Sequence, residues 1–312
     1  MRYLFLILSI LAPCLFLSSC LGSKTYVVSN YDDIQKTPLH ADGVYGRGLS
    51  DEDMLYLGRL KNIEVIDLCF NSHIKLNLTD NGLKNLAKIA SKLPKLRIIS
   101  VCKSDLITDK GLYWISKIKQ IDYVNISNCS KVTNEGFRFL SNNSGIKGIN
   151  MLYLEHVDNT TLQYLKDMPN LESLVSRGSR FLDTDSMRII SEFKKPKILM
   201  LTLENSPDFN DLSLKELSKS KTIESLTIEV NANITPNGIL SLAGIKSLKD
   251  FYLYKCPAIL VDKEMLKQFH SSLPNCEVLF EDSDYHTLYR YEPSGNKHTR
   301  PDLISSTDVS KK

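Results

Sequence analysis

The sequence predicts an α/β solenoid, with a parallel sheet on its concave side and short helices on its convex side. Three observations predict this fold. An apolar strand pattern recurs about every 25 residues, apolar residues at helical spacing follow each strand, and a helix-start signature stands between the two. A chain built from such repeats buries a continuous core only by stacking them side by side.

The strand pattern aligns on the apolar residue that opens each repeat. The opening residues are Ile63, Leu96, Ile121, Ile146, Leu171, Ile198, Ile223, Leu248 and Cys276, and five of the eight intervals between them are 25 residues. The opening residue and the third and fifth residues after it are expected to face the core. Of these 27 positions, all are Val, Ile, Leu, Met or Phe except Ser176, Cys276 and Glu281, although only 42% of the chain is hydrophobic. The period is therefore a property of the fold and not of the composition.

A helix is expected after each strand, because apolar residues recur 16 and 19 positions after the opening residue, on one helical face. Three of the expected helices begin at a threonine whose hydroxyl can accept from a free helix N–H: Thr108, Thr133 and Thr235. A glycine stands three residues after each of these threonines: Gly111, Gly136 and Gly238. We expect close packing against the neighbouring repeat at these glycines.

This pattern resembles the cysteine-containing subclass of leucine-rich repeat, about 26 residues long, which reads Leu-x-x-Leu-x-Leu-x-x-Cys followed by Ile-Thr-Asp-x-Gly-Leu. The segments "ISVCKSDLITDKGLYWI" and "NISNCSKVTNEGFRFL" carry the resemblance, which covers residues 49–282. The subclass cysteine is matched by Cys129 and Cys256 and replaced elsewhere, so the chain is similar to a degenerate member. The resemblance implies a horseshoe-shaped solenoid that serves as a protein–protein interaction module.

The first twenty residues read "MRYLFLILSILAPCLFLSSC", in which an apolar run follows one basic residue and is short for a spanning helix. The run resembles a bacterial lipoprotein signal peptide, because it ends in Leu17, two serines and Cys20. The resemblance implies removal of residues 1–19 and acylation of Cys20, for example with palmitate, which would anchor the chain to a membrane. An uncleaved anchor, or a plain signal with an incidental cysteine, is the alternative.

Composition and periodicity set the remaining boundaries. Residues 20–48 are polar and contain several glycines, and we expect them to be the lipidated cysteine and a tether. The solenoid is expected over residues 49–282, beginning with a cap at residues 49–54 that has no recognisable strand before it. Residues 283–312 lack periodicity and are expected to be a disordered tail.

Charge and motifs give no support to an enzyme. The 39 Lys and Arg against 36 Asp and Glu leave a net charge of +3 without a basic block, which does not favour nucleic acid. The six histidines make no zinc-binding spacing, and no phosphate-binding, dinucleotide-binding or nucleophile motif occurs. We therefore expect no enzyme activity, no cofactor and no metal site.

Two cysteines are expected to be neighbours. Cys69 and Cys102 both stand six residues after the opening residues of adjacent repeats, which places them side by side at strand ends. A disulfide between them is within reach in an exported protein. We expect two free thiols instead, because a pair across parallel strands is geometrically awkward. The other cysteines of the solenoid are expected to fill the core as small hydrophobes: Cys129, Cys256 and Cys276.

A partner is expected to bind the concave face, onto which the fourth and sixth residues after each opening residue should point. The candidate binding residues in these rows are Arg177, Glu204, Glu229, Tyr252 and Tyr254. Exposed tyrosines are typical anchors of protein interfaces, which is why the C-terminal pair leads this set. The alternative is that the two tyrosines merely shield the terminal repeat.

The resemblances together imply a membrane-anchored lipoprotein that binds a protein of unknown identity at the bacterial cell envelope. Because Leu21 is not aspartate, the lipoprotein resemblance implies the outer membrane if the cell has two membranes. One alternative is a structural envelope protein without a single ligand. Another is an adaptor acting on intracellular or host targets, since the repeat subclass resembles the substrate-recognition part of F-box proteins. Residues 21–48 are too short and too rich in glycine to supply an F-box.

Overall fold

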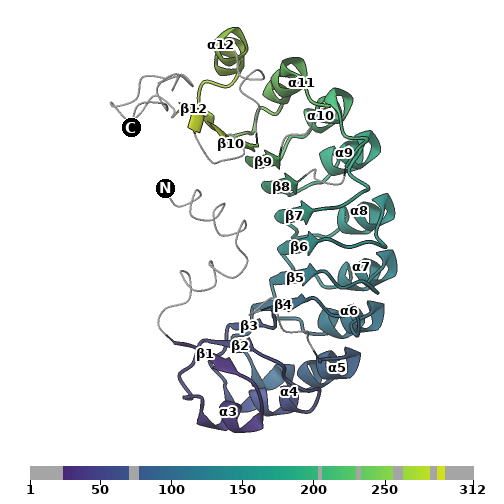
Figure 1. Ribbon diagram of the computed structural model, residues 1–312, viewed down its shortest axis with the longest axis vertical. Helices are drawn as coiled ribbons and strands as arrows, with labels where there is room; N and C mark the ends of the chain where they lie inside the picture. The colour runs from purple at the N-terminus through teal and green to yellow at the C-terminus, as the bar shows by residue number, and fades with distance from the viewer. Residues whose placement is uncertain are drawn as a thin grey trace. The chain divides into compact units, whose positions relative to one another are not determined.

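The computed structural model describes residues 24–69, 77–202, 206–229, 233–255, 263–281 and 287–291 (Figure 1). Contacts within the chain divide it into a first unit, Met1–Leu171, and a second unit, Glu172–Lys312. In each unit, strands alternate with helices along the chain, and the helices lie on one side of the strands (Figure 1). The predicted α/β solenoid is confirmed.

The first unit contains strands that pair parallel in chain order. They are β1 (Thr25–Val28), β2 (Gly43–Gly46), β3 (Val65–Asp67), β4 (Ile98–Cys102), β5 (Tyr123–Ser127) and β6 (Gly148–Leu152). Its α-helices are α3 (Tyr31–Lys36), α4 (Asp53–Tyr56), α5 (Asp80–Ile89), α6 (Asp109–Ser116), α7 (Asn134–Leu140) and α8 (Asn159–Leu165). Two 3₁₀ turns, η1 (Leu57–Arg59) and η2 (Ala90–Lys92), extend α4 and α5.

The second unit continues the same plan. Its parallel strands are β7 (Ser173–Arg177), β8 (Ile198–Thr202), β9 (Ser225–Glu229), β10 (Asp250–Tyr254) and β11 (Glu277–Glu281). Its helices are α9 (Thr184–Ser191), α10 (Asp211–Leu217), α11 (Pro236–Ser241), η3 (Leu242–Gly244) and α12 (Lys263–Ser272). A last strand, β12 (Thr287–Tyr291), pairs antiparallel with β11.

The core lies between strands and helices, where the period placed it. Ile99 and Val101 of β4 and Val124 and Ile126 of β5 are fully buried, and so are the apolar pairs that the following helices turn toward the strands. Burial of a whole side chain of this size contributes about 1.5–3 kcal/mol. The alternation of core-facing and outward-facing residues is confirmed on these strands.

The pairing register corrects the sixth repeat. Ile198 lies opposite Ser225, which is the second residue after the opening Ile223, so Ile198 does not open its own repeat. The core-facing residues of β8 are therefore Leu199 and Leu201. The alignment slipped by two residues because β8 is apolar at four successive positions. An unbroken apolar run does not show which of its residues opens the repeat.

The ninth repeat is corrected by one residue. Val278 and Phe280 lie opposite the core residues Phe251 and Leu253, so these two, and not Leu279 and Glu281, face the core of β11. The ring of Phe280 contacts that of Phe251 at 5.8 Å between centroids. Two of the three misfits in the predicted alignment belonged to this repeat, and the slip explains why.

Residues 24–48 are not a tether. They form β1, α3 and β2, and Val28, Ile34 and Val44 are fully buried among them. Helix α3 begins at Asn30, whose side chain accepts from the N–H of Asp33 at 3.0 Å. The strand missing before the predicted cap is β2, which is only four residues long and glycine at both ends. The asparagine before α3 and the short strand β2 do not recur at the repeat interval, so the repeat period did not reveal them. Residues 20–23 lie outside the described residues.

Part of the predicted tail is also folded. Residues 287–291 form β12, which continues the hydrogen bonding beyond β11. The remaining residues of the 283–312 segment lie outside the described part of the chain. A single antiparallel strand has no repeat with which to align, so the period could not predict it.

The helix-start signature joins neighbouring repeats as well as starting a helix. The hydroxyl of Thr133 accepts from the N–H of Glu135 at the start of α7. The N–H and hydroxyl of Thr133 donate to the two carboxylate oxygens of Asp109, one repeat earlier, at 2.8 Å each. The same link connects other repeats: Asp51 to Thr79, Asp80 to Thr108, and Asp211 to Thr235. The Thr-Asp dipeptide is therefore one step in a series of hydrogen bonds from helix to helix.

Glycine leaves room for this link. A Cβ on Gly136 would lie 2.6 Å from Oδ1 of Asp109 and 3.3 Å from its Cα, and the N–H of Gly136 itself donates to that oxygen at 3.0 Å. The predicted close packing is confirmed. Thr235 departs from the pattern, because its side chain accepts no hydrogen bond from α11, which begins with Pro236. Its hydroxyl donates to Asp211 instead.

Replacing Asp109 with alanine is expected to lower the free energy of unfolding by about 2 kcal/mol, because hydrogen bonds to Thr133 and Gly136 are lost together. Urea denaturation measures the change. Glu135→Ala is the matched control, since this exposed carboxylate pairs with Arg138 on its own helix and reaches no neighbouring repeat. Equal losses in the two variants would show that the link between repeats contributes nothing specific.

Candidate functional site

The strand-side face is the surface of the sheet that points away from the helices. In the first unit it carries one row of polar residues, one on each of four adjacent strands and opposite one another by register: Asp67, Ser100, Asn125 and Asn150. These positions alternate with the core residues, as expected of a strand. The first unit therefore presents a polar row across β3–β6.

The row is buried, whereas we expected it to be open to solvent. All four side chains fall in the buried class, and Asp67 has no exposed surface. Side chains on neighbouring strands stand about 5 Å apart, so small polar groups are covered by larger ones beside them. The half-buried Tyr123 is such a neighbour, and it hydrogen-bonds the side chain of Asn150.

Asp67 is the strongest electrostatic feature of the row. Its Oδ1 accepts from the N–H of Cys69 at 2.7 Å. Its Oδ2 is buried and has no hydrogen-bond donor among the described residues. Burial raises the pKa of the Asp67 carboxyl from 3.8 to about 6, against the opposing effect of the Cys69 N–H. The charged form is therefore disfavoured by its surroundings, and one oxygen is left to accept.

Asn150 offers a second acceptor at the other end of the row. Its Oδ1 is buried without a donor among the described residues. Burial raises the pKa of the Tyr123 phenol beside it to about 12, although the hydrogen bond with Asn150 lowers it, so this phenol stays protonated at neutral pH. Buried polar atoms without partners are rare in folded proteins. Two on one face call for a physical explanation.

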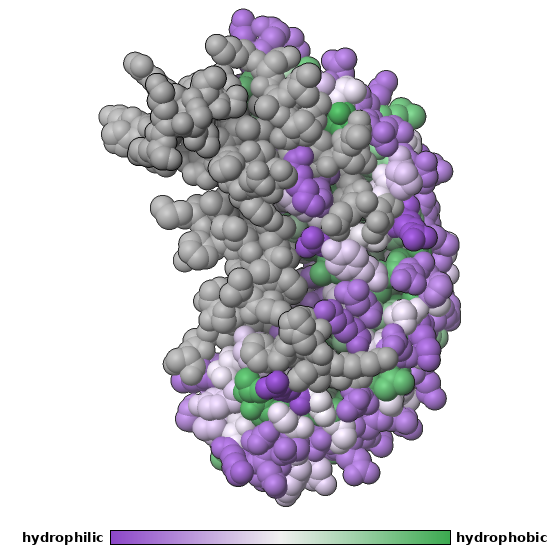
Figure 2. All heavy atoms as spheres, in the orientation of Figure 1, coloured by the Kyte–Doolittle hydropathy of each residue, from purple (hydrophilic) through white to green (hydrophobic). Residues whose placement is uncertain are grey.

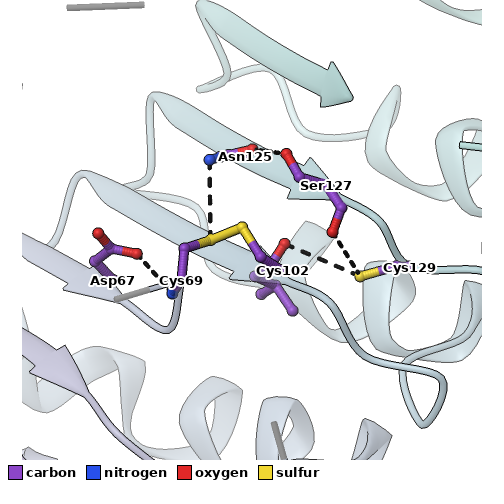
Figure 3. The surroundings of a disulfide bond; sticks show 7 residues. Asp67, Cys69, Cys102, Asn125, Ser127 and Cys129 are labelled. Carbon is purple, nitrogen blue, oxygen red and sulfur yellow. Dashed lines mark hydrogen bonds between the residues drawn. A yellow bond between two sulfur atoms is a disulfide. The ribbon is translucent and has the colours of Figure 1, made fainter. Parts of the chain in front are cut away.

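A disulfide closes one edge of the row (Figure 3). Cys69 and Cys102 are bonded, with their Cα atoms 4.9 Å apart, so the free thiols that we expected are not what the structure contains. Asp67 pairs with Ser100, and each cysteine stands two residues further along its chain, which brings the two Cα atoms within the range that disulfides span. Asn125 donates to the sulfur of Cys69 at 4.0 Å and accepts from the hydroxyl of Ser127 at 2.6 Å.

The free cysteines among the described residues are buried. Burial is the main reason that the pKa of both thiols, Cys129 and Cys276, is raised to about 12. A thiol that does not ionise is a poor nucleophile. Their predicted role as core residues is confirmed, and Cys256 lies outside the described residues.

The tyrosines of the second unit are not exposed anchors. Tyr252 and Tyr254 lie on the strand-side face of β10 and stack on each other, but only 8% and 3% of their surfaces are exposed. The hydroxyl of Tyr252 donates to Glu281, and that of Tyr254 donates to Glu229. Glu229 also pairs with Lys255, so its two oxygens are both engaged. The expectation that the two tyrosines are exposed on this face is wrong.

Of the other predicted binding residues, Arg177 does not join this cluster. Arg177 is half-buried at the end of β7, and β8 and β9 separate it from β10. Glu204 lies outside the described residues, and the corrected register gives its place in the row to Thr202. Arg177 and the tyrosine pair thus do not form one site. Asp67 and Asn150 are better candidates for binding residues. The signal available in the sequence was a single acidic residue, Asp67, in a row of otherwise neutral residues.

The described residues provide neither a metal-binding cluster nor a membrane-crossing helix. The described ranges hold no group of three His, Cys, Asp or Glu side chains that could bind a metal ion. Among the helices that the structure describes, none combines the length and the apolarity that a bilayer-crossing segment needs.

Replacing Asp67 with asparagine is expected to stabilise the protein at neutral pH. The pKa of the carboxyl is about 6 when folded and 3.8 ordinarily, so the folded state keeps the proton to higher pH. Its contribution to stability is complete below 3.8 and is lost as the pH rises through about 6. At pH 7 the loss is about 1–3 kcal/mol, which Asp67→Asn should restore.

Urea denaturation near pH 4 and near pH 7 measures this effect. The gain from Asp67→Asn should appear at the higher pH and vanish at the lower one. Asp185→Asn, at an exposed carboxylate of α9, is the control and should not stabilise the protein. A variant that is no more stable than the wild type near pH 7 would show that the buried carboxylate is compensated.

Comparison with known proteins supports the fold. No family model and no curated protein matches the chain. The chain is similar to a chain of the TLR13–ssRNA13 complex, with 19% identity, a TM-score of 0.51, and coverage of 84% of this chain and 38% of that one. It is also similar to a chain of the yeast Rad7–Elc1 complex, with 14% identity, a TM-score of 0.51, and coverage of 91% and 81%.

A third similar structure is an internalin, inlF, from Listeria monocytogenes, with 14% identity, a TM-score of 0.44, and coverage of 80% of this chain and 70% of that one. The present chain spans well under half of the TLR13 chain. TLR13 and Rad7 are leucine-rich-repeat proteins, and the similarity shows the fold at this level of identity. The chain folds as an α/β leucine-rich-repeat solenoid.

Proposed function

We propose that the chain is a protein-interaction module, held at the bacterial cell envelope by an acylated Cys20, in the outer membrane where the cell has two. A protein partner binds the strand-side face of the first unit. The fold supports this proposal, because the two similar structures with a TM-score of 0.51 are complexes, one with an RNA and one with the protein Elc1. The N-terminal sequence supports the anchor through its likeness to a lipoprotein signal peptide.

The observation that carries the proposal is the pair of acceptors for which the described residues supply no donor, Oδ2 of Asp67 and Oδ1 of Asn150. Both belong to the outer layer of the sheet and not to the core between strands and helices. Backbone N–H groups and the side chains of Lys, Arg and Asn supply the donors that such atoms require. Both atoms are buried in the free chain, so a partner reaches them by displacing the side chains that cover the row. A partner that then supplies donors removes an unfavourable state of the free chain, which strengthens binding.

A binding role fits the chemistry of the described residues better than catalysis. The free thiols Cys129 and Cys276 are buried, and their raised pKa keeps them protonated at neutral pH. The Asp67 carboxyl has a perturbed pKa, but the groups beside it are a disulfide and neutral side chains. By register Asp67 lies between Tyr45 and Ser100, and one carboxyl with a raised pKa does not by itself define a catalytic site.

Cross-linking in native membranes, followed by mass spectrometry, tests for the partner. We expect one protein to be captured in constant proportion, and Asn150→Ala to weaken its binding about tenfold, since a hydrogen bond to a buried acceptor is lost. Lys215→Ala on α10 is the control and should leave binding unchanged. Capture of many proteins in no fixed proportion would instead favour a structural envelope protein without a single ligand.

Replacing Cys20 with alanine is expected to move the protein from the membrane fraction to the soluble fraction, because the acyl chains supply the anchorage. Immunoblotting of fractionated cells measures the shift, and metabolic labelling with a fatty acid identifies the modification. Cys276→Ala is the control for labelling, since that thiol is buried. A wild-type chain that takes up no fatty acid would end the lipoprotein proposal.

A further inference from the structure

The helices of the first unit carry a cluster of aromatic rings on the side opposite the strands. Tyr113 and Trp114 lie on α6 and Phe139 on α7, and all three are half-buried. Tyr113 meets Trp114 edge to face at 5.0 Å between ring centroids, and meets Phe139 in the same way at 5.4 Å. The three rings therefore form one connected group on adjacent helices.

Each ring has a cation over its face. The pairs are Lys84 over Trp114 at 5.4 Å, Lys117 over Tyr113 at 4.4 Å, and Arg138 over Phe139 at 5.0 Å. Lys84 comes from α5, so the group spans three neighbouring helices. We call these six residues the aromatic–basic patch. Each cation is attracted electrostatically to the ring that it covers, and the opposite side of the cation faces away from that ring.

The surroundings of the patch are strongly basic. Residues 80–147, which include α5, α6 and α7, contain twelve Lys and Arg against five Asp and Glu, whereas the whole chain has an excess of only three positive charges. Four of the five acids have partners within the first unit. Asp80 and Asp109 bind the threonines of neighbouring repeats. Asp122 pairs with Arg97, and Glu135 pairs with Arg138. The positive charge is spread along the sequence, which is why no basic block marks it. Figure 2 shows the helix-bearing side as mostly hydrophilic.

We infer that the aromatic–basic patch docks on an anionic lipid surface. Aromatic rings are favoured at membrane interfaces, and the three rings keep part of their surface exposed, although the indole N–H of Trp114 is buried. Lysine and arginine next to them are attracted to anionic headgroups, and their stems cover apolar surface. The patch combines both features on the side of the chain that leaves the strand-side face free for a partner.

Lipid explains the patch better than nucleic acid does. Single-stranded nucleic acid binds by stacking its bases on open ring faces. In the patch each ring has a cation over one face, and the rings pack edge to face against one another. A membrane needs no open ring face, because it takes up ring edges and cationic stems together.

The inference extends the proposed lipid anchor, since a chain held near a bilayer meets that surface at high local concentration. The acyl anchor and the aromatic–basic patch differ in the lipid that they require. Acyl chains insert into neutral and anionic bilayers alike, whereas the patch requires anionic lipid and weakens with salt. The two can therefore be tested separately on the full chain.

Trp114 is the single tryptophan of the chain and lies within the patch, so its fluorescence reports on docking. The full chain is mixed with vesicles of brominated phosphatidylcholine, with or without phosphatidylglycerol. We expect the emission of Trp114 to fall at least twofold with the anionic vesicles and to recover at high salt. Sedimentation of the same samples reports association through the anchor, whatever the lipid charge.

A triple variant, Lys84→Gln with Lys117→Gln and Arg138→Gln, should require roughly 100-fold more anionic lipid for the same quenching, since each cation contributes to the attraction. The matched control removes three cations from the second unit, Arg188→Gln with Lys215→Gln and Lys219→Gln, and should be quenched like the wild type.

Two outcomes would overturn the inference. One is association with anionic vesicles by sedimentation while the emission of Trp114 stays unchanged. The other is quenching of Trp114 by a uridine oligonucleotide at concentrations where anionic vesicles have no effect, which would assign the patch to nucleic acid. A chain that sediments with anionic vesicles and is quenched by them, but does not sediment with neutral vesicles, would contradict the anchor alone.

Discussion

Leu226→Asp is expected to unfold more than one repeat of the second unit. Leu226 is 0% exposed on the core side of β9, between Leu199 of β8 and Phe251 of β10. Loss of a buried leucine and burial of a carboxylate without a partner should lower the free energy of unfolding by about 5 kcal/mol or more. That is comparable to the total stability of many domains.

The loss should spread, because a repeat buries its apolar surface only against its neighbours. Thermal denaturation should show a large fall in midpoint, and limited proteolysis should cut within β8–β10. Leu212→Asp is the matched control, since this leucine is 53% exposed on α10 and its replacement should be tolerated. A Leu226→Asp protein as stable as the wild type would mean that the core face of β9 is assigned wrongly.

The fold was predictable because its information is periodic. Alternating strand residues such as Ile99 and Val101, and the helix-start threonines Thr108 and Thr133, recur at a fixed interval, and each recurrence supports the others. In the unbroken apolar run of β8, the sequence does not show which residue opens the repeat, and the predicted alignment was wrong there. Where an element occurs only once, as β1, β2 and β12 do, no period exists to detect it.

The candidate site was less predictable, because it depends on burial and on partners. Alternation correctly placed Asp67 and Tyr254 on the strand-side face, but it does not say what covers them. Tyr254 proved to be buried against Glu229, and one oxygen of Asp67 proved to have no donor within the part of the chain that the structure describes. Both facts come from contacts between strands that are 25 or more residues apart in sequence, and their geometry is not encoded in any one repeat.

The disulfide has a bearing on where the chain works. A bond between Cys69 and Cys102 forms and persists in an oxidising compartment, which is the condition that the proposed export would provide. It closes a loop with a sequence separation of 33 residues, which includes α5 and most of β4. The bond restricts the unfolded chain over this loop and so favours the folded state.

Replacing both cysteines with serine is expected to lower the free energy of unfolding by about 3–4 kcal/mol, as the loop-closure estimate for this separation predicts. Urea denaturation of the wild type and of Cys69→Ser with Cys102→Ser, each with and without a dithiol reductant, measures the difference. Reduced wild type should match the variant, and the variant should not respond to reductant. Cys129→Ser is the control, since its buried thiol is not part of the bond. A wild type that is equally stable with and without reductant would show that the two thiols are free in solution, and the edge of the polar row would then be open to a partner's own side chains.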